Sequence, residues 1–191
     1  MNVKISDIAN LPSRFGNFKI QSFKEMTNFG IKEHLVIFKG NLEDIVNLRI
    51  HSECLTGDAI GSLKCDCRDQ LEASLKYIEK NGGMVIYLRQ EGRNIGLFNK
   101  VNAYALQDKG YDTISANHQL GFGTDERTYE IVEFILNHFK ISKINLLTNN
   151  PEKIKAMQNL QVCKRIPLII KPNKFDENYL KVKKEKMGHL L

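Results

Sequence analysis

The sequence predicts an α/β fold: a three-layer αβα sandwich on a mixed sheet, with an antiparallel N-terminal portion. The first third contains short extended pieces, among them 18–20 and the apolar run 35–38, and such runs are typical of antiparallel strands. From residue 67 onward, helical and strand patterns alternate, which indicates parallel strands joined by helices. The 191 residues, 42% of them hydrophobic, suit a single domain spanning 1–191.

The second third begins with an amphipathic helix. Leu71, Leu75 and Ile78 fall at i, i+4 and i+7, and the glycine at 82 marks the helix end. A buried strand at 84–88 is expected next. We then expect a polar loop at 89–94, a helix through Val101, Ala105 and Leu106 that ends at Gly110, and a second loop at 111–124.

The last third contains a strand, a helix and a further strand. Ile131, Phe134 and Ile135 predict a helix on which His138 lies at the edge of the core. We expect a strand at 144–148 and, after it, a helix over Ile154 and Met157. Asn150 would cap this helix and Pro151 would lie in its first turn. A further strand is expected at 166–170.

Charge and composition exclude several classes of protein. The 28 Lys and Arg outnumber the 22 Asp and Glu, so the net charge of +6 favours phosphate ligands. No nucleic-acid-binding motif is found, and the basic run 181–186 is interpreted as a solvated helix face, so we expect no nucleic-acid partner. No apolar run reaches the roughly 18 residues of a membrane span, and no export signal is found. We therefore expect a cytoplasmic protein with no membrane partner.

Three cysteines fall within one short segment. Cys54, Cys65 and Cys67 offer three thiolates, for which zinc is the usual ion. Three protein ligands leave a position for water, as in catalytic sites, whereas His51 could instead complete a closed structural site. Both alternatives remain open. Three thiolates and Zn²⁺ sum to −3 + 2 = −1, so a separate base would be needed to activate the water.

The cysteine pattern and three loops suggest water attack on a nucleotide. Zinc sites of three cysteines occur in base deaminases, and 51–53 spells His-x-Glu, but the deaminase Pro-Cys-x-x-Cys is absent. Arginines and glycines in 89–96 can approach phosphate, and Lys153 follows a helix start at 148–151. An exposed charged turn explains the first loop equally well, and ordinary capping is the favoured explanation of the second when it is taken alone. Ordinary capping also explains the helix start at 124–128, which is of interest only as a source of the base that the zinc site needs.

Taken together, the motifs resemble the GTP cyclohydrolase II family. The resemblance covers nearly the whole chain and several of its motifs are long. It is carried by 49–58, 65–67, 89–97, 99–100, 103–108, 110–113, 116–117, 121–122, 125–127, 146–151 and 186–191. Residues 68–69, 123–124 and 160–162 depart from the family pattern, which leaves local loop geometry open.

The resemblance implies hydrolytic opening of the imidazole ring of GTP at C8 in riboflavin biosynthesis, with release of formate and pyrophosphate. It implies one Zn²⁺ per subunit on the three cysteines, Mg²⁺, and a homodimer. Asp125 would be the proton acceptor and Arg127 the nucleophile at the α-phosphate, although a guanidinium is ordinarily a charge stabiliser. Tyr104 would help to orient the reacting groups. The implied substrate-binding residues are Arg49, Ile50, His51, Ser52, Glu53, Gln70, Glu91, Gly92, Arg93, Thr113, Thr148 and Lys153.

Two other functions remain open from the sequence. A nucleotide-binding or zinc-stabilised regulatory protein would bind GTP and zinc without forming product. A basic nucleic-acid binder would show salt-sensitive affinity for RNA or DNA.

Overall fold

The structure, a computed structural model, describes residues 1–190, so Leu191 of the C-terminal motif lies outside the described residues. Its centre is one eight-stranded sheet in the order β1-β3-β4-β6-β5-β7-β8, with β2 paired to β3. The strands are β1 (Asn2–Ile5), β2 (Ala9–Ser13), β3 (Gly16–Thr27), β4 (Gly30–Lys39), β5 (Ile45–Ser52), β6 (Gly83–Leu88), β7 (Lys143–Leu147) and β8 (Gln161–Ile166).

The sheet is mixed in the way that the sequence predicts. The pairs β1–β3, β2–β3, β3–β4 and β4–β6 are antiparallel, whereas β5–β6, β5–β7 and β7–β8 are parallel. The helices are α1 (Leu55–Asp58), α2 (Cys67–Asn81), α3 (Gly96–Gln107), α4 (Thr113–Gln119), α5 (Glu130–His138), α6 (Pro151–Ala156) and α7 (Glu177–Met187), with a short 3₁₀ turn at Glu91–Asn94.

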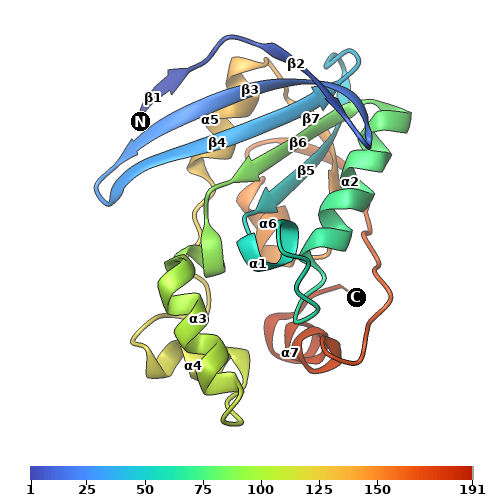
Figure 1. Cartoon of the computed structure of the whole chain (residues 1–191). Helices are drawn as coiled ribbons and strands as arrows, with labels where there is room; N and C mark the ends of the chain where they lie inside the picture. The colour runs from blue at the N-terminus through green and yellow to red at the C-terminus, as the bar shows by residue number, and fades with distance from the viewer. Residues whose placement is uncertain (191) are drawn as a thin grey trace.

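Helices cover both faces of the sheet, which confirms the three-layer αβα sandwich (Figure 1). On one face, Leu75 and Ile78 of α2 pack against Phe18, Ile37 and Val85. On the other face, the apolar side of α5 and the end of α6 pack on the larger core. That core joins Ile131, Val132, Ile135, Leu136 and Met157 to strand residues such as Leu48, Ile86 and Ile144.

The parallel strands end at one edge of the sheet. The last residues of β5 and β6, Ser52 and Leu88, lie side by side in the register. The strand β7, whose Leu146 pairs with Leu48 of β5, ends at the next residue, Leu147. Ligands of open α/β sheets bind outside the carboxyl ends of such strands. The helices α3, α4 and α7 lie beyond this edge (Figure 1). The fold therefore places the loops after β5, β6 and β7 around one space.

Three expectations about the elements are wrong. Residues 124–128, expected at a helix start, are not helical, and α5 begins at Glu130. The last strand runs over Gln161–Ile166 instead of 166–170, because Pro167 has no N–H to donate to the ladder. The segment 111–124, expected to be a loop, contains α4. This helix begins where the Asp112 carboxylate accepts hydrogen bonds from the backbone N–H groups of Ile114 and Ser115.

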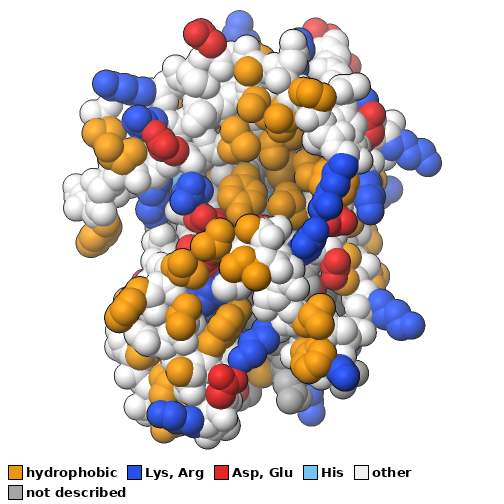
Figure 2. All heavy atoms as spheres, viewed as in Figure 1, with side chains coloured by type: hydrophobic (Ala, Val, Ile, Leu, Met, Phe, Trp, Pro, Cys, Tyr) orange, Lys and Arg blue, Asp and Glu red, His pale blue; other side chains and the backbone are white. Residues whose placement is uncertain are grey.

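Part of the surface near α3 and α4 is apolar. Space-filling atoms show hydrophobic side chains on the region of α3 and α4 (Figure 2), where Leu97, Phe98 and Val101 are 39%, 79% and 52% exposed. Among the described helices, none is long and apolar enough to cross a membrane.

Candidate metal centre and active site

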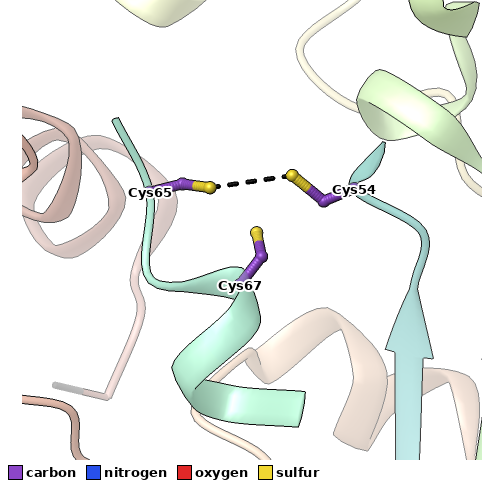
Figure 3. Close-up of side chains that lie close together, drawn as sticks. All are labelled: Cys54, Cys65 and Cys67. Atoms are coloured by element: carbon purple, nitrogen blue, oxygen red, sulfur yellow. Dashed lines mark hydrogen bonds between the residues drawn. The ribbon is translucent and has the colours of Figure 1, made fainter. Parts of the chain in front are cut away.

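The three cysteines predicted to bind a metal converge on one point (Figure 3). Cys54 follows β5, Cys65 lies in the loop after α1, and Cys67 begins α2. Their three Sγ atoms lie within 4.8 Å of one another, and Cys54 Sγ is 3.6 Å from Cys65 Sγ. Tetrahedral zinc with Zn–S bonds of about 2.3 Å requires S–S distances of about 3.8 Å. The donor set and its spacing therefore fit one zinc ion.

Gly57 of α1 packs directly behind the sulfurs. A Cβ at this position would lie 3.0 Å from both Cys54 Sγ and Cys65 Sγ, and 3.2 Å from Cys67 Cβ. Real Cβ contacts are seldom that short, so a side chain here would push the thiols apart. The absence of a side chain at Gly57 therefore helps to determine the geometry of the cysteine cluster.

His51 does not join the cysteine cluster. Its Nε2 lies 3.1 Å from Asp58 Oδ2, and its ring stacks on Tyr87 at a centroid distance of 5.3 Å. Burial lowers the pKa of His51, so the ring is neutral with Nε2–H donating to Asp58. Nδ1 is buried and has no hydrogen-bond partner among the described residues. The closed zinc site completed by His51, one of the two sequence alternatives, is not formed by these side chains.

Asp58 holds the start of the cysteine segment in place. Its carboxylate accepts hydrogen bonds from the backbone N–H of Cys54 at 3.0 Å and from the Tyr87 hydroxyl at 2.7 Å, besides the contact with His51. Burial and the bond to Asp58 raise the pKa of Tyr87, so its hydroxyl stays protonated and donates. One carboxylate thus links β6, the His51 ring and a zinc-ligand candidate.

A buried lysine contacts the sulfur of Cys54. Lys100 Nζ of α3 is 3.1 Å from Cys54 Sγ and 2.8 Å from Glu91 Oε1. Hydrogen bonds with the other two cysteines and the charge of Lys100 together lower the pKa of Cys54, whereas the bond to Cys54 raises the pKa of Cys65 to about 11. Lys100 thus brings a positive charge against the sulfur of Cys54.

The loop after β6 is fixed at both ends. Its first N–H, that of Arg89, donates to His34 Nδ1 at 3.0 Å. Gly92 and Arg93 both have φ of 62°, a left-handed conformation that favours glycine at 92 and is uncommon at 93. Arg93 Nη1 donates to the Thr124 carbonyl at 3.2 Å, and the Arg93 carbonyl accepts from Glu126 N–H. The loop is therefore tied to the segment that carries the predicted catalytic pair.

Asp125 and Arg127 contact each other. The Arg127 guanidinium donates to both carboxylate oxygens of Asp125, from Nε at 2.7 Å and from Nη2. Burial raises the pKa of Asp125, but the hydrogen bond and charge of Arg127 outweigh it and hold the pKa below its usual value. Arg127 Nη1 also lies 3.4 Å from Ser52 Oγ, the last residue of β5. Arg127 lines the pocket beside Ser52.

Two basic residues predicted to bind the substrate, Arg49 and Lys153, converge near the ends of β5 and β7. Arg49 is buried and donates to the Leu147 carbonyl at 3.1 Å and to Gln70 Oε1 at 2.6 Å. Lys153 Nζ donates to the Ile50 carbonyl at 2.8 Å. Burial lowers the pKa of Arg49 to about 10 and that of Lys153 well below its usual value. Positive groups are thus held close together out of water.

Most of the predicted site residues share one pocket of about 1100 Å³, including its open part. The side chain of Ile50 lies instead in the core, 1% exposed, and reaches the site through its carbonyl. Asp125 is also outside the pocket lining formed by the described residues. The predicted residues that line it are Arg49, His51, Ser52, Glu53, Cys54, Cys65, Cys67, Gln70, Glu91, Gly92, Arg93, Thr113, Arg127, Thr148 and Lys153.

The pocket also contains residues to which the sequence gave no role. Lys100, Lys183 and His189 line it, the last two from α7 and the chain end. Lys183 Nζ is 2.9 Å from Asp66 Oδ1, so one lysine of the run interpreted as solvated is buried against the metal segment. In the sequence, the cysteines on either side of Asp66 indicate that it lies near the metal site. Nothing in the sequence indicates that Lys183 is buried, because its burial depends on where its helix packs.

Comparison with known proteins decides the family. The model of the family described as GTP cyclohydrolase II matches residues 4–167. The chain belongs to the GTP cyclohydrolase II family. It is therefore an enzyme, a hydrolase of the riboflavin pathway.

Relatives match along the whole chain. A protein of Campylobacter hominis named GTP cyclohydrolase-2 is 72% identical over 191 residues, which are 100% of this chain and 97% of that protein. One of the same name from Helicobacter pylori is 56% identical and covers 99% of this chain and 98% of its own length. A solved structure of RibBX, a two-domain 3,4-dihydroxy-2-butanone 4-phosphate synthase from A. baumannii, is 18% identical. It covers 88% of this chain and 40% of that one, with a TM-score of 0.47.

Proposed function

We propose that this chain hydrolyses GTP at C8 of the guanine. Water opens the imidazole ring and the reaction releases formate and pyrophosphate. The remaining product is 2,5-diamino-6-ribosylamino-4(3H)-pyrimidinone 5′-phosphate. One observation carries the proposal: the three converging cysteines lie in the same pocket as Arg93, Arg127 and Lys153, in a member of the GTP cyclohydrolase II family. The pocket thus combines a hydrolytic metal site with groups for a triphosphate.

Zinc would be held by Cys54, Cys65 and Cys67, one ion per subunit. When bound there, zinc supplies a Lewis acid that makes water a nucleophile near neutral pH. Mg²⁺ is proposed as the ion that accompanies the triphosphate, since it binds through phosphate oxygens and water. No ligand of this chain is assigned to Mg²⁺.

The protein's own groups would bind and orient the nucleotide. Arg93, Arg127 and Lys153 would bind phosphate oxygens, because charged donors form strong hydrogen bonds with phosphate. Because Nε2 of His51 carries the proton, its Nδ1, which has no hydrogen-bond partner among the described residues, can only accept a hydrogen bond. It would accept one from an N–H or O–H of the substrate. The other proposed substrate contacts are Arg49, Ile50 through its carbonyl, Ser52, Glu53, Gln70, Glu91, Gly92, Thr113 and Thr148.

Asp125 would accept the proton that the reaction releases, and Arg127 would act at the α-phosphate. Their ion pair gives a physical link between the two roles. A phosphate that attracts the Arg127 guanidinium frees the Asp125 carboxylate, whose pKa then rises and makes it a better base. Tyr104, whose hydroxyl lies 3.4 Å from Thr56 Oγ1, lines the same pocket and would orient the reacting groups.

The family also implies a homodimer in the cytoplasm. Light scattering after size-exclusion chromatography tests the first point, with an expected mass of twice 21.9 kDa. A mass of 21.9 kDa at working concentration would refute the dimer.

Product analysis tests the proposed reaction. The full-length protein is incubated with GTP, Mg²⁺ and Zn²⁺, and formate, pyrophosphate and the pyrimidine product are measured. We expect Cys54→Ser, Cys65→Ser and Cys67→Ser each to abolish formate release. Cys163→Ser is the matched control, because this thiol is exposed on β8, and it should keep full activity. Formate release that survives in all three site variants refutes the proposed zinc role, and GTP binding without product refutes the reaction.

A further inference from the structure

Lys100 and Glu91 form a buried pair whose contacts are with the protein. Their side chains are 10% and 9% exposed, and Lys100 Nζ is 2.8 Å from Glu91 Oε1. Buried charges are costly unless they are paired and hydrogen-bonded. This pair is therefore an ordered part of the pocket wall.

Each member of the pair is also bonded to the segment that carries Cys54. Lys100 Nζ lies 3.1 Å from Cys54 Sγ. The Glu91 carboxylate accepts from the N–H of Leu55, the residue after Cys54, at 2.5 Å, and from Gly92 N–H at 2.9 Å. The oxygens of Glu91 are thus occupied by donors of the chain itself.

We propose that Lys100 is a positioning residue that donates a charge-assisted hydrogen bond to the Cys54 thiolate, and that Glu91 holds it there. This inference rests on the proposed zinc site and adds a residue to it. Lys100 acts through the sulfur and needs no contact with GTP, whereas Glu91, also a proposed substrate contact, acts on the zinc site only by holding Lys100 and the Leu55 N–H.

The charge of the site explains why a cation belongs there. Three thiolates and Zn²⁺ carry −1 in total, and the ammonium of Lys100 offsets this charge at the sulfur. Hydrogen bonds to a ligand also limit how much electron density it donates to the metal. Lys100 therefore places its positive charge directly against one of the three sulfurs, 3.1 Å from Cys54 Sγ.

Packing around Lys100 supports this role. A Cβ on Gly92 would lie 3.1 Å from Lys100 Cβ and 3.2 Å from a side-chain carbon of Ile95. Only the missing side chain lets α3 approach the loop after β6 so closely. Lys100 Nζ is also 5.7 Å from the centre of the Tyr104 ring, one turn along α3. The ammonium is enclosed on several sides.

Zinc affinity tests the proposal without relying on turnover. Zinc binding to the full-length protein is measured at pH 7 by competition with a chromophoric chelator. We expect Lys100→Met, which removes the charge but keeps the shape, to weaken zinc about 10- to 100-fold. Lys100→Arg should restore part of the affinity, and Glu91→Gln should weaken zinc less than Lys100→Met does. Lys64→Met is the matched control: Lys64 precedes Cys65 but pairs with Asp108 at 2.7 Å, so zinc affinity should not change.

Cobalt substitution gives an independent readout. Loss of the cation raises the energy of the sulfur electrons, so the sulfur-to-cobalt absorption of Lys100→Met should shift to longer wavelength. Zinc affinity within twofold of the original chain, together with an unshifted spectrum, would overturn the inference. A rise in the KM for GTP at unchanged zinc affinity would also overturn the inference, because it would make Lys100 a substrate contact.

If the unsubstituted chain binds no zinc, the proposed function itself fails, and the two failures are thereby distinguished. Should Lys100→Met not fold, Glu91→Gln decides by the same two measurements.

Discussion

Many charged side chains of the pocket are bonded to the protein before any ligand arrives. Arg127 is paired with Asp125, Lys153 with the Ile50 carbonyl, and Lys100 with Glu91. Such bonds fix the positions of the groups and reduce the reorganisation that binding requires. A phosphate that enters the pocket must compete with Asp125 for Arg127. Without a ligand, the proposed base Asp125 and the guanidinium of Arg127 are therefore paired with each other.

The Asp125–Arg127 pair makes stability depend on pH. Burial alone would raise the pKa of Asp125, but Arg127 outweighs it and the pKa in the folded chain lies below the unfolded value of about 3.9. The pair therefore stabilises the fold fully above about pH 4 and less as pH falls through the folded pKa. We expect Asp125→Asn to lower the free energy of unfolding by about 1 to 3 kcal/mol at pH 7, and by progressively less below pH 4.

Urea denaturation between pH 7 and pH 3 measures this difference. Asp108→Asn is the control, because it removes a carboxylate from an exposed pair with Lys64 and should cost under about 1 kcal/mol throughout. A destabilisation by Asp125→Asn that stays constant across the pH range would mean that the pair does not control the titration.

Short elements between the strands set the geometry of the cysteines. The helix α1 has four residues, and a Cβ on its Gly57 would lie 3.0 Å from both Cys54 Sγ and Cys65 Sγ, closer than most real Cβ contacts. Gly57→Ala should therefore push the sulfurs apart and weaken zinc about tenfold or more, since ligand position controls metal affinity. The chelator competition measures this effect. Gly123→Ala, remote from the sulfurs and facing the end of the Glu126 side chain, should keep the original affinity. Equal zinc affinity in both variants would contradict a role of Gly57 in shaping the site.

Elements with a strong periodic pattern could be predicted from the sequence, and weakly patterned ones could not. The apolar faces of α2 and α5 and the buried runs of β6 and β7 lie where their patterns indicate. The predicted position of β8 was wrong because this strand pairs with β7 alone, contains no fully buried residue, and precedes a more apolar run beyond Pro167. Helix α4 is short, and only its Asp112 cap marks it.

The site could be predicted where residues act through their own chemistry. The spacing of Cys54, Cys65 and Cys67 suggested a shared metal, and their sulfurs do meet. The partners that surround them come from distant segments: Lys100 from α3 and Lys183 from α7. In the sequence both are ordinary helix lysines. Their burial follows from how α3 and α7 pack beyond the sheet edge, which no local pattern records.

At the scale of the whole molecule, the chain end returns to the pocket that the sheet forms. Lys183 of α7 contacts Asp66 between two zinc-ligand candidates, and Leu190 N–H donates to the Asn149 carbonyl at 2.9 Å. Between them, His189 lines the pocket. The matched family model ends at residue 167, so this wall is formed by residues after the matched region. Helix α7 thus connects the metal segment with the loop after β7.

Removal of the His189 side chain tests whether this wall serves binding. Burial, and then the charges of Lys183, Arg127 and Lys153, lower the pKa of His189 to about 3, so its ring is neutral among cations at pH 7. A neutral ring there can donate to a phosphate oxygen without adding to the repulsion. We expect His189→Ala to raise the KM for GTP about tenfold, with zinc affinity unchanged because the ring does not contact sulfur.

His118→Ala is the matched control, since this histidine is exposed on α4, and the KM of this variant should be that of the original chain. Steady-state kinetics with a zinc assay on the same samples gives both quantities. An unchanged KM in His189→Ala would show that the chain end covers the pocket without contacting the substrate.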